Sequence, residues 1–139
     1  MRKAFSEEQH QQDDLPAKMV VSKYISKHWG VWVKQGTQYD VDLVCYFDDE
    51  IMSYVEVERR HNWVDKFPFD TVHVPGRKSK FFNLDKTTFL FSVRSDLKQA
   101  MWCSGKSIME CPIEYKNNKH CDNEDFFVVP IGLWTLTDL

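Results

Sequence analysis

Four acidic side chains at alternate positions are the residues of this sequence best suited to chemistry. Asp40 and Asp42 lie in one segment, and Glu56 and Glu58 lie in the next. Both segments alternate apolar and polar residues with a period of two, which is typical of β-strands. If the apolar faces join one core, the carboxylates gather on the opposite face, where they repel one another unless a cation lies between them. Hard oxygen ligands of this kind favour Mg²⁺ or Mn²⁺.

The alternative is a solvated hairpin face that holds no metal. Like charges that face each other across two strands are unfavourable, so we prefer the metal site, with Asp40 as an outer or surface acid. Register is strongly specified when one face of a hairpin is buried. We therefore expect either an odd-length turn around residues 48–50 or a compensating β-bulge. Either arrangement places Asp42 opposite Glu56 or Glu58.

The rest of the chain supplies the elements that position these acids. Residues 17–29 have the apolar spacing of an amphipathic helix closed by Gly30, whereas residues 76–82 carry an irregular basic run. Ser95 or Asp96 is expected to cap a further short helix. That helix is predicted over 97–101. The other predicted elements are strands at 31–34, 71–74, 87–93, within 108–115 and at 126–131. This order predicts an α/β (α+β) fold with a mixed central β-sheet and flanking helices.

Length and composition limit the classes of protein. The chain has 139 residues with ten Phe, five Trp and five Tyr, which predicts a single domain over 1–139 with residues 1–16 as a flexible N-terminal segment. The net charge of -3 provides no global basic field, so nucleic-acid binding must depend on local patches. There is no apolar run of about 18 residues, which argues against a membrane span or a signal peptide. We expect a cytoplasmic protein.

The four cysteines do not form a familiar metal motif. Cys45, Cys103, Cys111 and Cys121 include no C-x-x-C pair, although His120 precedes the last of them. A zinc site remains the alternative. Reduced thiols, with Cys45 buried on its strand, are the preferred interpretation.

The arrangement of the acids resembles a known superfamily. Its two parts are Asp42 on the first strand and Glu56-Val57-Glu58 on the second, after the lead-in Ser53-Tyr54-Val55. This pattern resembles the PD-(D/E)XK nuclease superfamily, which has the restriction-endonuclease-like fold. The resemblance covers roughly residues 17–102 and includes the order of elements.

The resemblance implies a metal site and a reaction. By analogy with the family, Asp42, Glu56 and the carbonyl of Val57 would bind Mg²⁺. Many members add a Glu from the leading helix, for which Glu7 or Glu8 is a poor match. Family members cleave nucleic acids, so a nucleic-acid partner, preferably DNA, is expected.

The sequence departs from the family pattern at one residue. Glu58 stands where most members have a Lys that orients or deprotonates the attacking water. A Glu can accept a proton or join the metal shell, but it cannot supply positive charge. That charge must come from the metal or from basic residues, which are also expected to contact phosphate: Arg59, Arg60, Arg77, Lys78 and Lys80.

The sequence therefore predicts a small Mg²⁺-dependent nuclease that hydrolyses DNA phosphodiester bonds, with Asp42, Glu56 and Glu58 as catalytic residues. A homodimer is expected, because cutting two strands needs two sites. Its small size would suit a phage or mobile element. Because of Glu58, the alternative is a catalytically inactive module of the same fold that binds nucleic acid or a protein. An acidic mimic of DNA is a third alternative, which the mild charge of -3 disfavours.

Overall fold

The computed structural model describes residues 14–36, 39–116 and 124–139. Within these residues the helical elements are α2 (Leu15–Trp29), η1 (Gly76–Lys78), α3 (Ser79–Phe82), α4 (Gly105–Met109) and η2 (Ile131–Leu133). The strands are β1 (Trp32–Gln35), β2 (Leu43–Phe47), β3 (Glu50–Arg60), β4 (Thr71–Pro75), β5 (Thr87–Arg94), β6 (Gln99–Ser104), β7 (Ile113–Lys116), β8 (Glu124–Pro130) and β9 (Thr135–Asp138).

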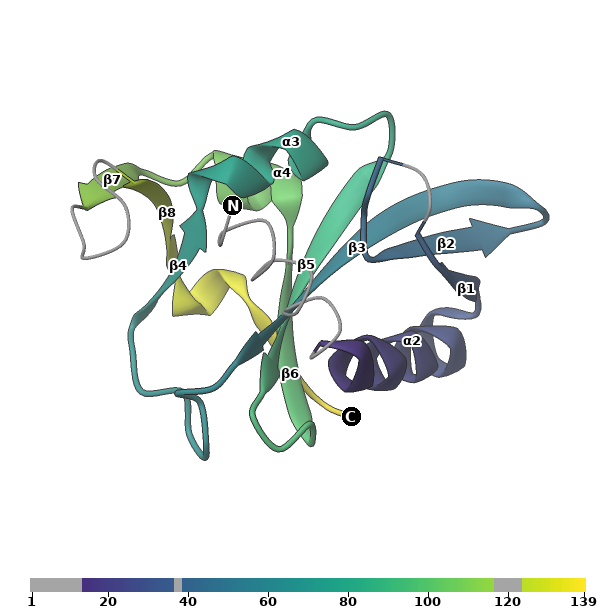
Figure 1. The fold of residues 1–139 in the computed structure, drawn as a ribbon, viewed down its shortest axis with the longest axis horizontal. Helices are drawn as coiled ribbons and strands as arrows, with labels where there is room; N and C mark the ends of the chain where they lie inside the picture. The colour runs from purple at the N-terminus through teal and green to yellow at the C-terminus, as the bar shows by residue number, and fades with distance from the viewer. Residues whose placement is uncertain (1–13, 37–38, 117–123) are drawn as a thin grey trace, which may run out of the picture.

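Two β-sheets form the framework. The larger sheet has six strands in the order β1-β2-β3-β5-β6-β9, and the smaller has three in the order β4-β8-β7. In the larger sheet β3 and β5 are parallel, whereas its other neighbouring strands are antiparallel. Figure 1 shows β3 and β5 in the middle of the molecule, with the smaller sheet beyond them on the opposite side from β1 and β2. The mixed α+β fold expected from the sequence is confirmed.

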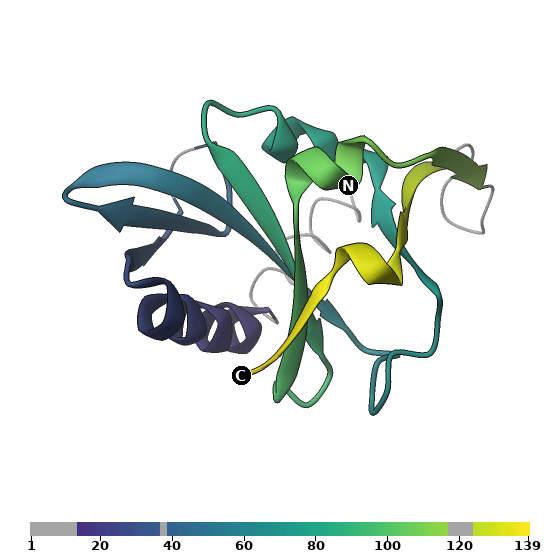
Figure 2. The ribbon, with the colours of Figure 1, turned by 180° about the vertical axis from the view of Figure 1, so that it is seen from behind.

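The larger sheet is covered on both faces. Helix α2 packs on one face through Ala17, Val21 and Ile25, which recur every fourth residue and are fully buried. The other face packs against α3, α4 and the smaller sheet, with Tyr54 and Leu90 in that second cluster. Figure 2 shows the molecule from behind, with the C-terminal segment running beside β6. Burial on both faces explains the nearly continuous apolar sequence of β5.

Helix α2 begins and ends at residues with suitable backbone preferences. Pro16 lies in its first turn, where the missing N–H costs no hydrogen bond. Gly30 follows Trp29 with φ 66°, a left-handed conformation that glycine adopts readily. The predicted end is confirmed, but the helix begins at Leu15, inside the segment 1–16 that was expected to be flexible. Residues 1–13 lie outside the described residues.

The helix predicted over 97–101 is wrong. Asp96 accepts hydrogen bonds from Arg94 Nε at 2.8 Å and from the Lys98 N–H at 3.0 Å, and Leu97 has φ 66°. An aspartate that bonds the backbone two residues ahead favours a tight turn over a helix. The chain therefore reverses here, and Gln99–Ser104 forms β6, antiparallel to β5.

Two further segments differ from the sequence prediction. The basic run expected to be irregular forms the short helices η1 and α3. The strand expected within 108–115 begins only at Ile113, because Gly105–Met109 forms α4 with the Ser104 hydroxyl accepting from the Ser107 N–H. The strands predicted at 31–34, 71–74, 87–93 and 126–131 correspond to β1, β4, β5 and β8.

In the described part of the chain, no helix combines the length and apolar character needed to cross a membrane.

Candidate active site

The register of the β2–β3 hairpin brings Asp42 to Glu56. Leu43, the first residue of β2, pairs with Val55, so Asp42 lies opposite Glu56 one residue before β2 begins. The hairpin turn is Asp48–Asp49, with φ 50° and 65°, as in a type I′ turn. The odd-length turn is therefore wrong. The alternative is confirmed, because a β-bulge between Cys45 and Tyr46 shifts the register.

Asp40 and Asp42 precede β2 and do not lie on an outward strand face, as the sequence had suggested. Tyr39 and Asp40 form a turn with φ 59° and 58°, and Asp40 is exposed. Val41 also belongs to a different core cluster from Leu43, so the two apolar side chains lie on opposite faces of the larger sheet. The physical reason is that a left-handed turn interrupts the alternation of side chains that a continuous strand would have.

Two backbone-to-carboxylate hydrogen bonds join the Asp42 segment to β3. The Asp42 N–H donates to Glu56 Oε2 at 2.8 Å, and the Val57 N–H donates to Asp42 Oδ2 at 2.8 Å. Because β2 begins only at Leu43, the part of β3 beyond Val55 meets the Asp42 carboxylate in place of a paired strand. We call this place the notch, defined by Asp42, Glu56 and Val57. Within a strand, the N–H and C=O of one residue point to the same side, so the Val57 carbonyl also faces the notch.

Two lysines from different elements contact these acids. Lys18 Nζ of α2 lies 3.2 Å from Asp42 Oδ1, and Lys78 Nζ of η1 lies 2.9 Å from Glu56 Oε1. Lys78 was predicted to contact phosphate, and the structure places it on Glu56. The sequence analysis missed Lys18. The available signal was its position beside Ala17, at the border of the buried stripe of α2.

Burial dominates the electrostatics of the notch. Glu56 is only 2% exposed, which raises its pKa to about 7, with Lys78 lowering it and the Asp42 charge raising it. Burial alone would lower the pKa of Lys78. The charges of Glu56, Glu58 and Asp42 and the hydrogen bond to Glu56 together raise it by more, so the pKa lies above its ordinary value. Lys78 therefore carries a full positive charge next to a carboxyl group that titrates near neutral pH.

Glu58 lies on the same face of β3 as Glu56 but has a different partner. Its Oε2 is 3.3 Å from Arg60 Nη2, and its side chain is 29% exposed. Among the described residues, no group of three or more His, Cys, Asp or Glu side chains is arranged to hold a metal. The pair of Asp42 and Glu56 with the Val57 carbonyl suits Mg²⁺, which commonly uses one or two carboxylates and keeps several waters.

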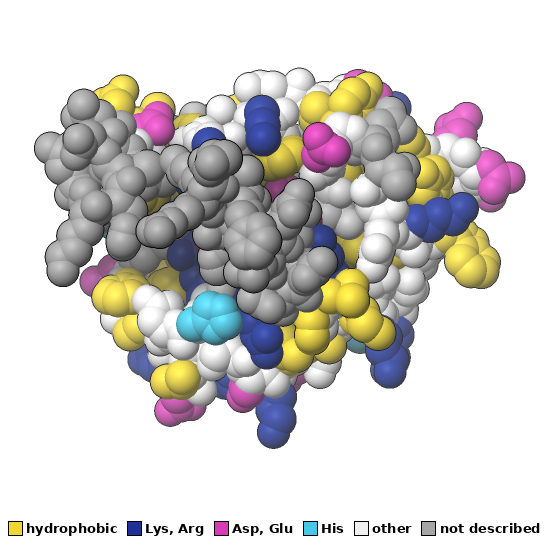
Figure 3. All heavy atoms as spheres, viewed as in Figure 1, with side chains coloured by type: hydrophobic (Ala, Val, Ile, Leu, Met, Phe, Trp, Pro, Cys, Tyr) yellow, Lys and Arg dark blue, Asp and Glu magenta, His cyan; other side chains and the backbone are white. Residues whose placement is uncertain are grey.

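The other predicted basic residues are dispersed. Arg59 donates to the Ser95 carbonyl at 2.9 Å and 3.2 Å, whereas Arg60 donates to the His73 carbonyl at 3.2 Å. Arg77 and Lys80 are exposed, and Lys80 Nζ lies 4.9 Å from the centre of the Phe81 ring. Figure 3 shows basic, acidic and hydrophobic side chains interspersed over the described part of one face. Contacts to phosphate by these residues stay a prediction.

Some predicted residues lie outside the described part of the chain. Glu7 and Glu8 are among them, as are His120 and Cys121 of the alternative zinc site. The cysteines that the structure describes are free thiols: Cys45 and Cys103 are buried, and Cys111 is half-buried.

Comparisons with known proteins support the fold. No protein family model and no curated protein sequence matches this chain. Among solved structures, the chain is similar to that of D212, a nuclease from a fusselovirus, with a TM-score of 0.50 and 12% sequence identity. The match covers 91% of this chain and 84% of that one. The chain therefore has a nuclease-like fold.

Proposed function

We propose that this protein is a small Mg²⁺-dependent nuclease of the PD-(D/E)XK type that hydrolyses DNA phosphodiester bonds at the notch. The observation that carries the proposal is the pair of bonds from the Asp42 N–H to Glu56 and from the Val57 N–H to Asp42, which holds the two carboxylates close together where β2 begins. Two such acids, one of them buried, are costly to bring together without positive charge beside them; Lys18 and Lys78 supply that charge here, and a bound metal ion could take their place. The nuclease-like fold supports this interpretation.

The side chains of the notch fit the metal that the proposal requires. Asp42 and Glu56 would provide carboxylate oxygens, and Val57 would provide its carbonyl. When bound, Mg²⁺ would activate a water molecule and offset the negative charge that develops on the phosphate. Lys18 and Lys78 neutralise the two carboxylates in the metal-free protein, so metal binding would require these amino groups to shift.

Lys78 would supply the positive charge that the family pattern normally places at position 58. Its amino group contacts Glu56, and its side chain is partly exposed, so it reaches the surface beside the acids. After the shift that metal binding requires, an ammonium group that stays beside the acids would stabilise negative charge on a phosphate oxygen. Although Glu58 replaces the usual lysine, the Lys78 ammonium group would therefore still provide a positive charge at the notch.

Glu58 would act as a general base or an outer ligand. Arg60 orients its carboxylate without burying it, so a water between Glu58 and the notch could give up its proton there. Lys78 and Glu58 together would then divide the two roles that one lysine combines in most of the family.

Plasmid nicking with Mg²⁺ or Mn²⁺ tests the proposal. Wild type should nick DNA only with the metal, and Asp42→Ala and Glu56→Ala should each abolish nicking. Activity that survives both substitutions would refute the assignment of the notch. Binding without cleavage under either metal would favour the inactive, nucleic-acid-binding alternative. An RNA substrate in parallel tests the preference for DNA, and sedimentation of the protein with duplex DNA tests for a dimer.

A further inference from the structure

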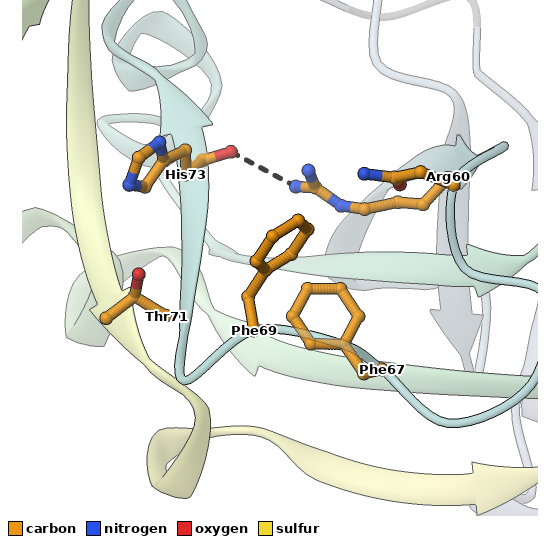
Figure 4. A pocket seen from close by; sticks show the side chains of 6 residues that line it. Arg60, Phe67, Phe69, Thr71 and His73 are labelled. Carbon is orange, nitrogen blue, oxygen red and sulfur yellow. Dashed lines mark hydrogen bonds between the residues drawn. The ribbon is translucent and has the colours of Figure 1, made fainter.

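A cavity of about 330 Å³ lies between the end of β3 and the start of β4, further along the strand that carries Glu56. Arg60 and Asn62 line it from β3 and the following turn, and Phe67, Phe69, Thr71 and His73 line it from the connection and β4. Figure 4 shows the Phe69 ring directed into the space between the Arg60 guanidinium and β4, with Phe67 beside it. Neither phenylalanine has a role in the proposed cleavage chemistry.

We propose that this cavity, which we call the Phe69 cavity, binds one base of the DNA strand whose backbone lies over the notch. The inference rests on the proposed nuclease function and adds where the substrate strand is held. Its occupant is an unpaired base, because a base in a duplex has no free face and edge to offer.

The aromatic wall provides a stacking surface. Phe67 and Phe69 have ring centres 5.8 Å apart at 75°, and Phe67 also packs edge-to-face on the buried Trp63 at 5.6 Å. Phe67 is therefore held in place, whereas Phe69 is 54% exposed. An exposed phenyl ring at the entrance of a cavity suits the face of a base, which stacks on aromatic side chains irrespective of sequence.

Arg60 provides a fixed polar wall. Its Nε donates to Ser92 Oγ at 3.3 Å, and its Nη2 donates to Glu58 and to the His73 carbonyl. Nη1 makes no hydrogen bond to any described residue. The bonds of Nε and Nη2 therefore fix the plane of the guanidinium, and the N–H groups of Nη1 stay available to a ligand. Together with the exposed Asn62 amide, Arg60 can hydrogen-bond the edge of a base. This combination of ring and polar edge fits a base better than an apolar peptide side chain.

The position of the cavity is consistent with a strand that also crosses the notch. Glu56, Glu58 and Arg60 are alternate residues of β3 and share one face, so Arg60 lies about 13 Å along the strand from Glu56. The opposite border is also shared, since β4 carries His73 and leads directly into η1 with Lys78. One extended strand of nucleic acid can therefore meet both places along β3.

The test compares Phe69→Ala with Phe47→Ala. Phe47 is a matched control, because it is 51% exposed but lies at the distant end of the β2–β3 hairpin. The probe is a short single-stranded oligodeoxynucleotide, measured by fluorescence anisotropy, together with versions that lack one base at successive positions. We expect Phe69→Ala to bind about tenfold more weakly and Phe47→Ala to bind like wild type.

The abasic series distinguishes stacking from a structural effect. At one position, loss of the base should weaken wild type by about the same tenfold and leave Phe69→Ala unchanged. The inference is overturned if no position shows this coupling, even if Phe69→Ala binds weakly. Unchanged cleavage and unchanged binding by Phe69→Ala overturn it as well, while the nuclease proposal stands. If wild type neither binds nor cleaves nucleic acid, both proposals fail.

Discussion

The notch and the Phe69 cavity lie on the same face of β3, and they differ in almost every physical property. The notch gathers buried, paired charges, with Glu56 almost inaccessible and Lys78 against it. In the cavity, by contrast, the Phe69 ring is 54% exposed and packs against the ring of Phe67. Chemistry needs groups that are fixed and protected from water, since reorganisation raises the barrier. Substrate capture needs exposed surface that becomes buried only on binding.

The largest expected effect separates the two regions. Glu56→Gln keeps the size of the side chain but removes the charge, so cleavage should fall by at least about 10³-fold, or about 4 kcal/mol of barrier. Binding of the oligonucleotide should change little. Phe69→Ala should show the reverse, with weaker binding and an unchanged rate at saturating substrate. Single-turnover cleavage and anisotropy measure the two quantities, and equal losses in both variants would contradict the division of roles.

The second prediction concerns Lys78. Lys78→Met removes the ammonium group beside Glu56 and should lower the cleavage rate by about 10²-fold or more. It also removes the charge that lowers the pKa of Glu56, so the pH profile of the remaining activity should move to higher pH. Lys80→Met, an exposed lysine of the adjoining helix, is the control and should leave the profile in place. A rate loss without a shifted profile would contradict the contact with Glu56 as its cause.

The third prediction tests the role proposed for Glu58. Glu58→Gln should lower the rate by about 10²-fold, the lower end of the range for loss of a general base. Metal affinity, measured by calorimetry, should remain close to that of wild type if Glu58 acts on water. A strong loss of metal binding would make Glu58 a direct ligand, and an unchanged rate would remove it from the mechanism.

The fourth prediction follows from the pKa of Glu56 near 7. Below that pH the folded protein holds a proton that a metal must displace, so at subsaturating Mg²⁺ cleavage should be about tenfold slower at pH 6 than at pH 8. More Mg²⁺ should move the midpoint to lower pH. The folded pKa exceeds the ordinary value of 4.5, so without metal the free energy of unfolding should fall as pH rises between these values. In the Glu56→Gln variant, the free energy of unfolding measured with urea should not show this fall with pH.

Much of the framework could be predicted because it depends on local rules. The apolar spacing of α2 and its end at Gly30 follow from helix periodicity and the left-handed preference of glycine. Apolar and polar residues alternate in β3, so one face of the hairpin was expected to be buried. This limited the hairpin to registers that place Asp42 opposite Glu56 or Glu58. The helix at 97–101 failed because the side-chain bonds of Asp96 favour a turn, and pairing with β5 completes the strand.

The sequence by itself determined most of helix α2, the strands β1, β4, β5 and β8 and the hairpin that brings Asp42 near Glu56, because alternation, capping and register act over neighbouring residues. Only the tertiary structure decided which charges meet. Lys18 and Lys78 reach Asp42 and Glu56 from separate elements, and Glu56 is buried although its neighbours in the sequence do not mark it as a core residue. Phe69 and Arg60 likewise meet only because β4 returns beside the end of β3. These contacts depend on packing between distant segments, which no local pattern of residues specifies.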